Sequence, residues 1–183
     1  MAAVLYSAIC SLDGYVADAN GGFAWAVPDA EVRAAVNDVQ RSVGTWLLGH
    51  RTYAVLQAWD DAGPTTPEEA EHQRLWRGSD KVVYARTQQP EVGPRARLAP
   101  VFDPEDVRRV KEWAEADLLV GGPTLATAAF AGGLVDGLHL FVVPVAVGGG
   151  LPALPAAQRL DLTLVSERRF GCGVVHLAYR VRR

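Results

Sequence analysis

A short apolar run that stops on two glycines is the segment of this chain best suited to bind a charged ligand. Leu118–Val120 has the apolar character of a buried strand, and Gly121 and Gly122 follow it directly. Pro123 then suits the first turn of a helix. Glycine lets the backbone approach a ligand without a Cβ in the way, and the free N–H groups at a helix start favour a phosphate. A tight turn that binds nothing is the alternative interpretation.

Two further predicted strand ends carry polar side chains. The residues at these ends are Gly49, His50, Arg51 and Thr52 after one apolar run, and Arg86 and Thr87 after the next. Ligands of parallel α/β sheets bind outside the carboxyl ends of the strands, and arginine pairs strongly with phosphate. Taken singly, each arginine is typical of a solvated surface position. Taken together with the glycines, these residues favour a dinucleotide that carries an extra phosphate, which is NADPH.

Asp13, Asp29 and Trp25 are candidates for chemistry on a substrate. When a nicotinamide cofactor supplies a hydride, a proton must also reach the substrate, from a carboxylic acid or from an ordered water. Asp13 and Asp29 are the candidate acids, although Asp13 also suits an Asp-Gly turn and Asp29 also suits a helix N-cap. Trp25 could stack on the substrate or the nicotinamide, or pack against the protein.

Strand-like and helix-like segments alternate through the first part of the chain, and these elements must position the candidate residues. Apolar runs predict strands over residues 4–10, 45–48, 81–85, about 98–102 and 117–120. Capping patterns and helical periodicity predict helices that start near Asp29, Thr52, Thr66, Asp103 and Thr124. This alternation is typical of an α/β domain with a largely parallel sheet.

The character of the chain changes to β-rich after residue 137. Residues 138–147 form a long apolar run in which Pro144 indicates a bulge or an edge position. Residues 161–170 and 173–182 alternate around Gly171–Gly173, which predicts an antiparallel hairpin. Long loops are expected at 86–97 and 148–160. We predict one domain over residues 1–183.

Composition excludes several functional classes. The chain has 183 residues, 49% of them hydrophobic and 21% charged, with a net charge of −3. That balance is typical of a soluble globular domain and argues against binding to nucleic acid or to an anionic membrane. The first apolar run is too short for a membrane span, and two cysteines do not make a disulfide framework, so we expect a cytoplasmic protein. The spacing of the four histidines does not indicate a metal site.

Several segments together resemble the dihydrofolate reductase-like superfamily. They are Ser11–Tyr15, Leu48–Tyr53, Tyr84–Thr87 and Val120–Leu125. With Ala131–Leu138 and Val143–Gly150, the chain is most similar to the C-terminal reductase domain of bifunctional riboflavin-biosynthesis enzymes. The resemblance implies a mixed, mostly parallel sheet of about eight strands, NADPH as cofactor and assembly as a homodimer through residues 138–147 and the C-terminal hairpin.

The resemblance also implies roles for individual residues. Gly49, His50, Arg51 and Thr52 would touch the pyrophosphate and the adenosine phosphate, and Arg86, with Thr87 beside it, would approach the 2′-phosphate. Gly121, Gly122, Pro123, Thr124 and Leu125 would hold the pyrophosphate, and a cis peptide between Gly121 and Gly122 is one form that the resemblance allows. Tyr15, Val16 and Ala17 would form a loop that lines the nicotinamide.

The chain departs from the best-known members where the substrate is selected. Ala30 stands where dihydrofolate reductases carry the carboxylate that binds the pterin ring, with Asp29 beside it. Val120 stands where riboflavin-pathway reductases usually carry glutamate, and their Asp-Asp-Pro segment is missing. His50 replaces a usual arginine, which weakens the expected preference for NADPH over NADH. We therefore expect an NADPH-dependent reductase of a pterin-like or 5-amino-6-(5-phosphoribosylamino)uracil-like heterocycle. A catalytically inactive dinucleotide-binding module is the alternative.

Overall fold

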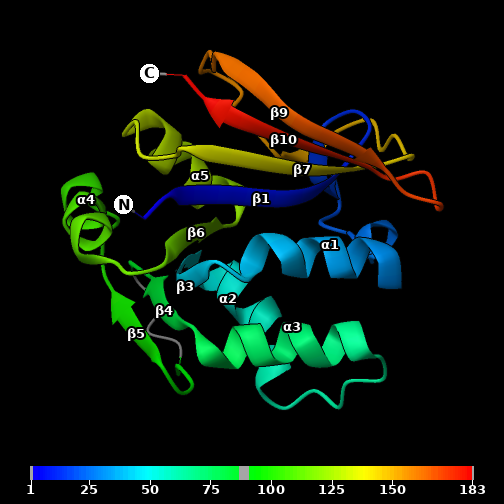
Figure 1. Ribbon diagram of the computed structural model, residues 1–183. Coiled ribbons are helices and arrows are strands. Elements are labelled where there is room, and N and C mark those ends of the chain that lie inside the picture. The colour runs from blue at the N-terminus through cyan, green and yellow to red at the C-terminus, as the bar shows by residue number, and fades with distance from the viewer. Residues whose placement is uncertain (1, 87–90, 183) are drawn as a thin grey trace.

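The computed structural model describes residues 2–86 and 91–182, and within them an eight-stranded sheet carries helices on both faces (Figure 1). The strand order is β5-β4-β3-β6-β1-β7-β10-β9. Strands β5 to β7 in that order pair in parallel, whereas β10 is antiparallel to both β7 and β9. The strands of this sheet are β1 (Val4–Ser11), β3 (Val43–Gly49), β4 (Asp80–Tyr84), β5 (Ala96–Ala99), β6 (Asp117–Gly121), β7 (Gly137–Val143), β9 (Leu162–Arg169) and β10 (Val175–Val181). The predicted fold class is confirmed.

Helices cover the two faces of the sheet unequally. One face carries α1 (Ala30–Gln40), α2 (His50–Leu56) and α3 (Pro67–Gly78), and the other carries α4 (Pro104–Trp113) and α5 (Pro123–Ala131). Two short 3₁₀ helices, η1 (Ala24–Ala26) and η2 (Gln57–Asp60), precede α1 and follow α2. Within the described residues, no helix is long and apolar enough to cross a membrane.

The apolar side chains of the central strands fill a core on each side of the sheet. Leu47 packs with Tyr6 and with Phe130 of α5, whereas its neighbour Leu48 packs on the opposite face with Trp76 of α3. Successive side chains of a strand point to opposite faces, so strands buried on both faces must be apolar throughout. Burial of each large apolar side chain contributes about 1.5–3 kcal/mol, and this holds the layers together.

The structure differs from the sequence predictions mainly where pairing is long-range or where proline intervenes. Strand β5 lies at Ala96–Ala99 rather than at 98–102, and β7 ends at Val143 because Pro144 has no N–H to donate. Residues predicted as loops form a second, two-stranded sheet, in which β2 (Tyr15–Asp18) pairs with β8 (Gly150–Pro152). The expected loop at Tyr15, Val16 and Ala17 is therefore a strand.

The C-terminal hairpin forms as predicted and carries a bulge. The pairing of β9 with β10 shifts between Ala178 and Tyr179, which leaves one additional residue, Val165, on β9. The turn of the hairpin reaches the start of α1, where Glu31 accepts a hydrogen bond from the Gly171 backbone N–H over 3.2 Å. The fold thus brings a C-terminal turn next to a helix that begins about 140 residues earlier in the chain.

Candidate functional site

Three predicted strand ends lie level at one edge of the sheet. Gly49 at the end of β3 pairs with Tyr84 at the end of β4, and Leu48 pairs with Gly121 at the end of β6. Neighbouring strands lie roughly 4.8 Å apart, so the three ends fall within about 10 Å. The structure therefore brings together the residues that follow them: His50, Arg51, Thr52, Arg86, Gly122, Pro123, Thr124 and Leu125. Thr87 lies outside the described residues.

The two helices that begin at this edge differ from the other three in their N-caps. The side chains of Asp29, Thr66 and Asp103 accept a hydrogen bond from a backbone N–H at the starts of α1, α3 and α4. Helices α2 and α5 instead begin after Gly49 and Gly122, which provide no side-chain cap. The first N–H groups of a helix have no intrahelical acceptor, so this edge presents backbone donors to an anion.

Gly121 and Gly122 also have a packing role that sequence reasoning missed. A Cβ on Gly121 would collide with the side chain of Leu48, and a Cβ on Gly122 would collide with the Thr52 hydroxyl. Gly122 has a φ of +91°, which favours glycine. The glycines thus let the β6–α5 turn pack closely against the start of α2, and they place the Thr52 hydroxyl beside the α5 N-terminus. The peptide between Gly121 and Gly122 is trans, so the cis form considered from the resemblance is wrong.

The remaining residues of this edge are accessible. Arg51 and Arg86 are exposed, and neither forms a salt bridge with a residue that the structure describes. His50 and Thr52 are half-buried. No atom lies within 4 Å of the position that a Cβ on Gly49 would take, so the surface outside this residue is open. Two cations and an open surface beside backbone N–H donors suit an anionic ligand.

Asp13 anchors a neighbouring loop. Its carboxylate accepts hydrogen bonds from the Ser11 hydroxyl (2.6 Å) and from the backbone N–H groups of Gly148 (2.7 Å) and Val147 (3.1 Å). These bonds, that of Ser11 first, hold the pKa of Asp13 below its usual value. The Ser11 hydroxyl in turn accepts from the Tyr15 N–H over 3.0 Å and ties in β2. The geometry therefore favours the turn role of Asp13 over that of a proton donor.

The RibD C-terminal domain family matches residues 2–176. The chain belongs to this family. The uncharacterized protein YyaP of Bacillus subtilis (strain 168) is 29% identical over 174 residues, which cover 92% of this chain and 89% of YyaP.

Two solved structures share the fold at low sequence identity. The putative riboflavin biosynthesis protein from Shewanella sp. PV-4 matches with a TM-score of 0.78 and 18% identity, over 99% of both chains. A diaminohydroxyphosphoribosylaminopyrimidine deaminase/5-amino-6-(5-phosphoribosylamino)uracil reductase from Thermotoga maritima matches with a TM-score of 0.67 and 15% identity, over 99% of this chain and 57% of that one. The resemblance seen in the sequence is thereby confirmed for family and fold.

A second part of the candidate site in this RibD-type domain lies at the ends of β1 and β7. Asp29 caps α1, where its carboxylate accepts from the Val32 N–H over 2.9 Å. This bond and a hydrogen bond from the Cys172 thiol hold the pKa of Asp29 below its usual value. Trp25 is half-buried in η1, and its indole N–H is buried without a partner among the described residues. Both side chains line one cavity of about 170 Å³.

Cys172 and Val174 of the C-terminal hairpin line the same cavity, and sequence reasoning did not assign them to a site. No local pattern marks them, because a cysteine between two glycines reads as an ordinary turn. They reach the cavity only because β10 pairs with β7, which carries the hairpin over the start of α1. Among the described residues, no group of three or more His, Cys, Asp or Glu side chains could hold a metal ion.

Proposed function

We propose that this protein is an NADPH-dependent reductase that acts on a small planar heterocycle. Membership of the RibD C-terminal domain family supports a reductase, because the structurally similar Thermotoga maritima protein is a bifunctional deaminase and 5-amino-6-(5-phosphoribosylamino)uracil reductase. One observation carries the proposal: two helix N-termini without side-chain caps lie side by side at the carboxyl edge of the sheet. Ligands of such sheets bind at this edge.

The residues present fit a phosphorylated dinucleotide. The backbone N–H groups of Thr124 and Leu125 and the Thr52 hydroxyl would bind the pyrophosphate, whereas Pro123 has no N–H to contribute. Arg51 and Arg86 would pair with the additional phosphate, because their guanidinium groups are exposed beside this edge. The bound cofactor supplies a hydride, and the protein supplies binding and orientation.

The substrate side of the mechanism involves residues around η1 and α1. Asp29 is held ionised by its hydrogen bonds, so its carboxylate would accept N–H groups of the heterocycle and orient the ring. Trp25 would stack on the ring, because its indole lines the same cavity as Asp29. Since the pKa values of Asp13 and Asp29 are both lowered, an ordered water is the better proton donor.

A homodimer remains a prediction, and two surface features support it. A shallow groove of about 710 Å³ runs over the starts of β1 and β7 and the end of β10, on a part of the sheet that includes Leu5 and His139. Leu164 and Val165 on the edge strand β9 are 50% and 61% exposed. Exposed apolar side chains on an edge strand are a common site of association between copies of a chain.

A Gly49→Val variant tests the cofactor assignment. A Cβ added at position 49 would lie in open space, and the φ of Gly49 is −69°, which valine adopts readily. Valine should therefore leave the fold and its melting temperature unchanged. The added side chain should obstruct the phosphate and weaken NADPH binding about tenfold or more in calorimetry, which corresponds to about 1.4 kcal/mol. Gly63→Val is the matched control. A Cβ added at position 63 would also meet open space, and this residue lies in the segment between η2 and α3 rather than at the end of a strand.

Unchanged NADPH affinity in a folded Gly49→Val protein would contradict the assignment. The same preparation separates an enzyme from an inactive binding module. Oxidation of NADPH in the presence of pterins or aminouracils supports the reductase, whereas tight NADPH binding with no turnover over the whole set supports the binding module.

A further inference from the structure

The cavity beside Trp25 is closed on one side by the turn of the C-terminal hairpin. Its walls are apolar and include Ile9 of β1, Val32 of α1 and Val143 of β7. Cys172 and Val174 form the side that the hairpin contributes. A volume of about 170 Å³ is well below the roughly 300–1,000 Å³ of pockets for drug-sized ligands, so this cavity suits a single ring system rather than a nucleotide.

The polar groups of this cavity are few. Asp29 provides a carboxylate, Cys172 provides a thiol on the same wall, and Trp25 provides the apolar surface of its indole ring. These groups match the edge of a heterocycle that carries both N–H donors and acceptors.

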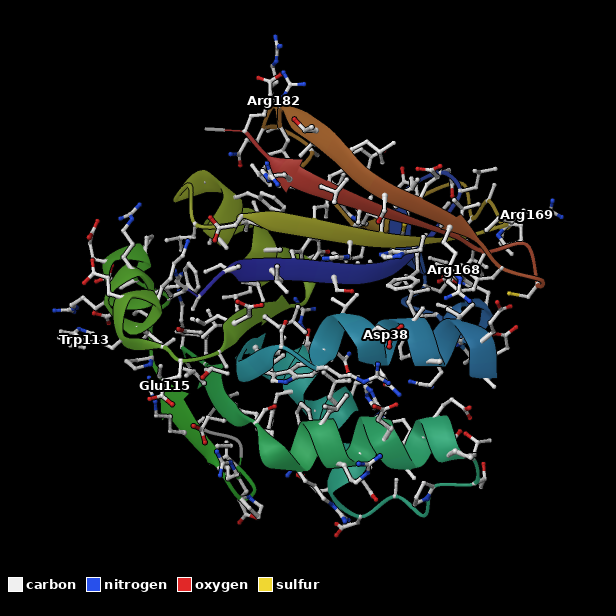
Figure 2. All side chains as sticks on the ribbon, viewed as in Figure 1. Asp38, Trp113, Glu115, Arg168, Arg169 and Arg182 are labelled. Carbon is white, nitrogen blue, oxygen red and sulfur yellow. The ribbon has the colours of Figure 1, made fainter. Side chains whose placement is uncertain are left out.

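The charge of the cavity argues against a phosphate. Its lining contains one carboxylate and no lysine, arginine or histidine. Arg168 on β9 lies above the start of α1 in Figure 2, but it is paired with Glu31 at 2.9 Å and lies over the Phe170 ring at 4.6 Å. Phosphate binding in proteins relies on free cations or helix N–H groups, and the N–H of Val32 at this helix start is already bound to Asp29.

We propose that Cys172 is a specificity-determining residue of the substrate pocket, which admits an unphosphorylated heterocycle of one ring system. The turn that carries Cys172 limits the pocket to that size, and the thiol contacts the bound ring next to Asp29. The proposal rests on the proposed reductase function, and it separates this chain from the Thermotoga maritima relative, whose named substrate carries a phosphoribosyl group. It further assigns the hairpin turn, rather than the nucleotide edge, to substrate selection.

Thiol labelling of the unmodified protein tests the contact. Cys172 is exposed and the other cysteine, Cys10, is 2% exposed, so the rate of alkylation by iodoacetamide reports on Cys172, with the site checked by mass spectrometry. The two probes share one ring: 5,6-diaminouracil and 5-amino-6-(5-phosphoribosylamino)uracil. We expect saturating 5,6-diaminouracil to slow alkylation about tenfold and the phosphorylated compound to slow it less than about twofold. Equal protection by both, or protection by neither, overturns the proposal.

Variants of the turn test specificity independently of labelling. Cys172→Phe should fill the pocket and weaken binding of 5,6-diaminouracil about tenfold or more in calorimetry, while Cys172→Ser keeps the size and the donor and should bind as the native protein does. Ser166→Phe, an exposed position on β9, is the control for an added aromatic side chain on the same hairpin. Native affinity in a folded Cys172→Phe protein overturns the proposal.

These measurements need no cofactor, so they fail separately from the proposed function. Suppose that 5,6-diaminouracil protects Cys172 from alkylation and that Gly49→Val binds NADPH as the native protein does. These results would support the role of Cys172 in the substrate pocket and contradict the cofactor site. The opposite pattern would uphold the cofactor site and overturn the role of Cys172.

Discussion

Two arginines at the carboxyl edge of the sheet should set the choice between nicotinamide cofactors. Arg51 and Arg86 follow adjacent strands and are both exposed. NADPH differs from NADH by one phosphate, and a charge-assisted hydrogen bond contributes about 1.5–3 kcal/mol. We therefore expect Arg51→Ala and Arg86→Ala each to weaken NADPH binding roughly 10- to 100-fold in calorimetry and to leave NADH binding nearly unchanged.

Arg74→Ala on α3 is the control for the loss of an exposed arginine elsewhere. If an arginine variant loses NADPH and NADH affinity equally, that residue acts on the fold or on the shared part of the dinucleotide, and the placement at the 2′-phosphate is wrong.

The junction of two strand-to-helix turns is the critical contact between elements. Gly122 combines a φ of +91° with contact against Thr52, whereas Gly133 has a φ of +62° and no atom within 4 Å of its Cβ position. A positive φ costs a residue with a Cβ about 1–2 kcal/mol, and overpacking adds about 1–3 kcal/mol. Gly122→Ala should therefore lower the free energy of unfolding more than Gly133→Ala does, as measured by urea denaturation.

A double-mutant cycle isolates the contact with Thr52. In a Thr52→Ala background the colliding hydroxyl is gone, so Gly122→Ala should lower the free energy of unfolding less than it does in the native background. If the effects of the two substitutions on the free energy of unfolding are additive, the close contact between Gly122 and Thr52 that the structure indicates is contradicted.

One buried and one half-buried histidine should govern the stability of the whole molecule in mild acid. Burial lowers the pKa of His72 to about 4, and burial, then His139 and Arg168, lower that of His176 to about 4. The unfolded chain takes up these protons near pH 6.5, so it binds more protons than the folded chain between pH 6.5 and about 4. Stability contributed by neutral histidines is therefore present above pH 6.5 and is lost as the pH falls through that window.

The expected loss between pH 7 and pH 5 is up to about 2 kcal/mol for each of the two histidines, measured by urea denaturation at each pH. His176 stacks on Phe141 with ring centroids 4.3 Å apart, so His176→Phe keeps an aromatic ring there and removes the titration. That variant should show a shallower decline with acid than the native protein. A native protein equally stable at both pH values would contradict the placement of these rings.

Local patterns predicted much of this fold and part of the site. The N-caps Asp29, Thr66 and Asp103 marked the starts of α1, α3 and α4, because a cap depends on residues within one helical turn. The three strand ends were also predictable, since parallel strands place their carboxyl ends at a common edge. The strands β2 and β8 were missed, because neither carries an alternating pattern and their pairing joins residues far apart in the chain.

The sequence by itself determined the alternation of strands and helices and the polar residues that follow β3, β4 and β6, because these depend on local propensity and apolar periodicity. The family followed from the resemblance of short motifs to those of a known family. Only the tertiary structure decided that Asp13 anchors residues 147–148, that Gly122 packs against Thr52, and that Cys172 lines the same cavity as Asp29. Each of these contacts joins residues far apart in the chain. Such contacts are set by the order and register of the strands, which no local pattern encodes.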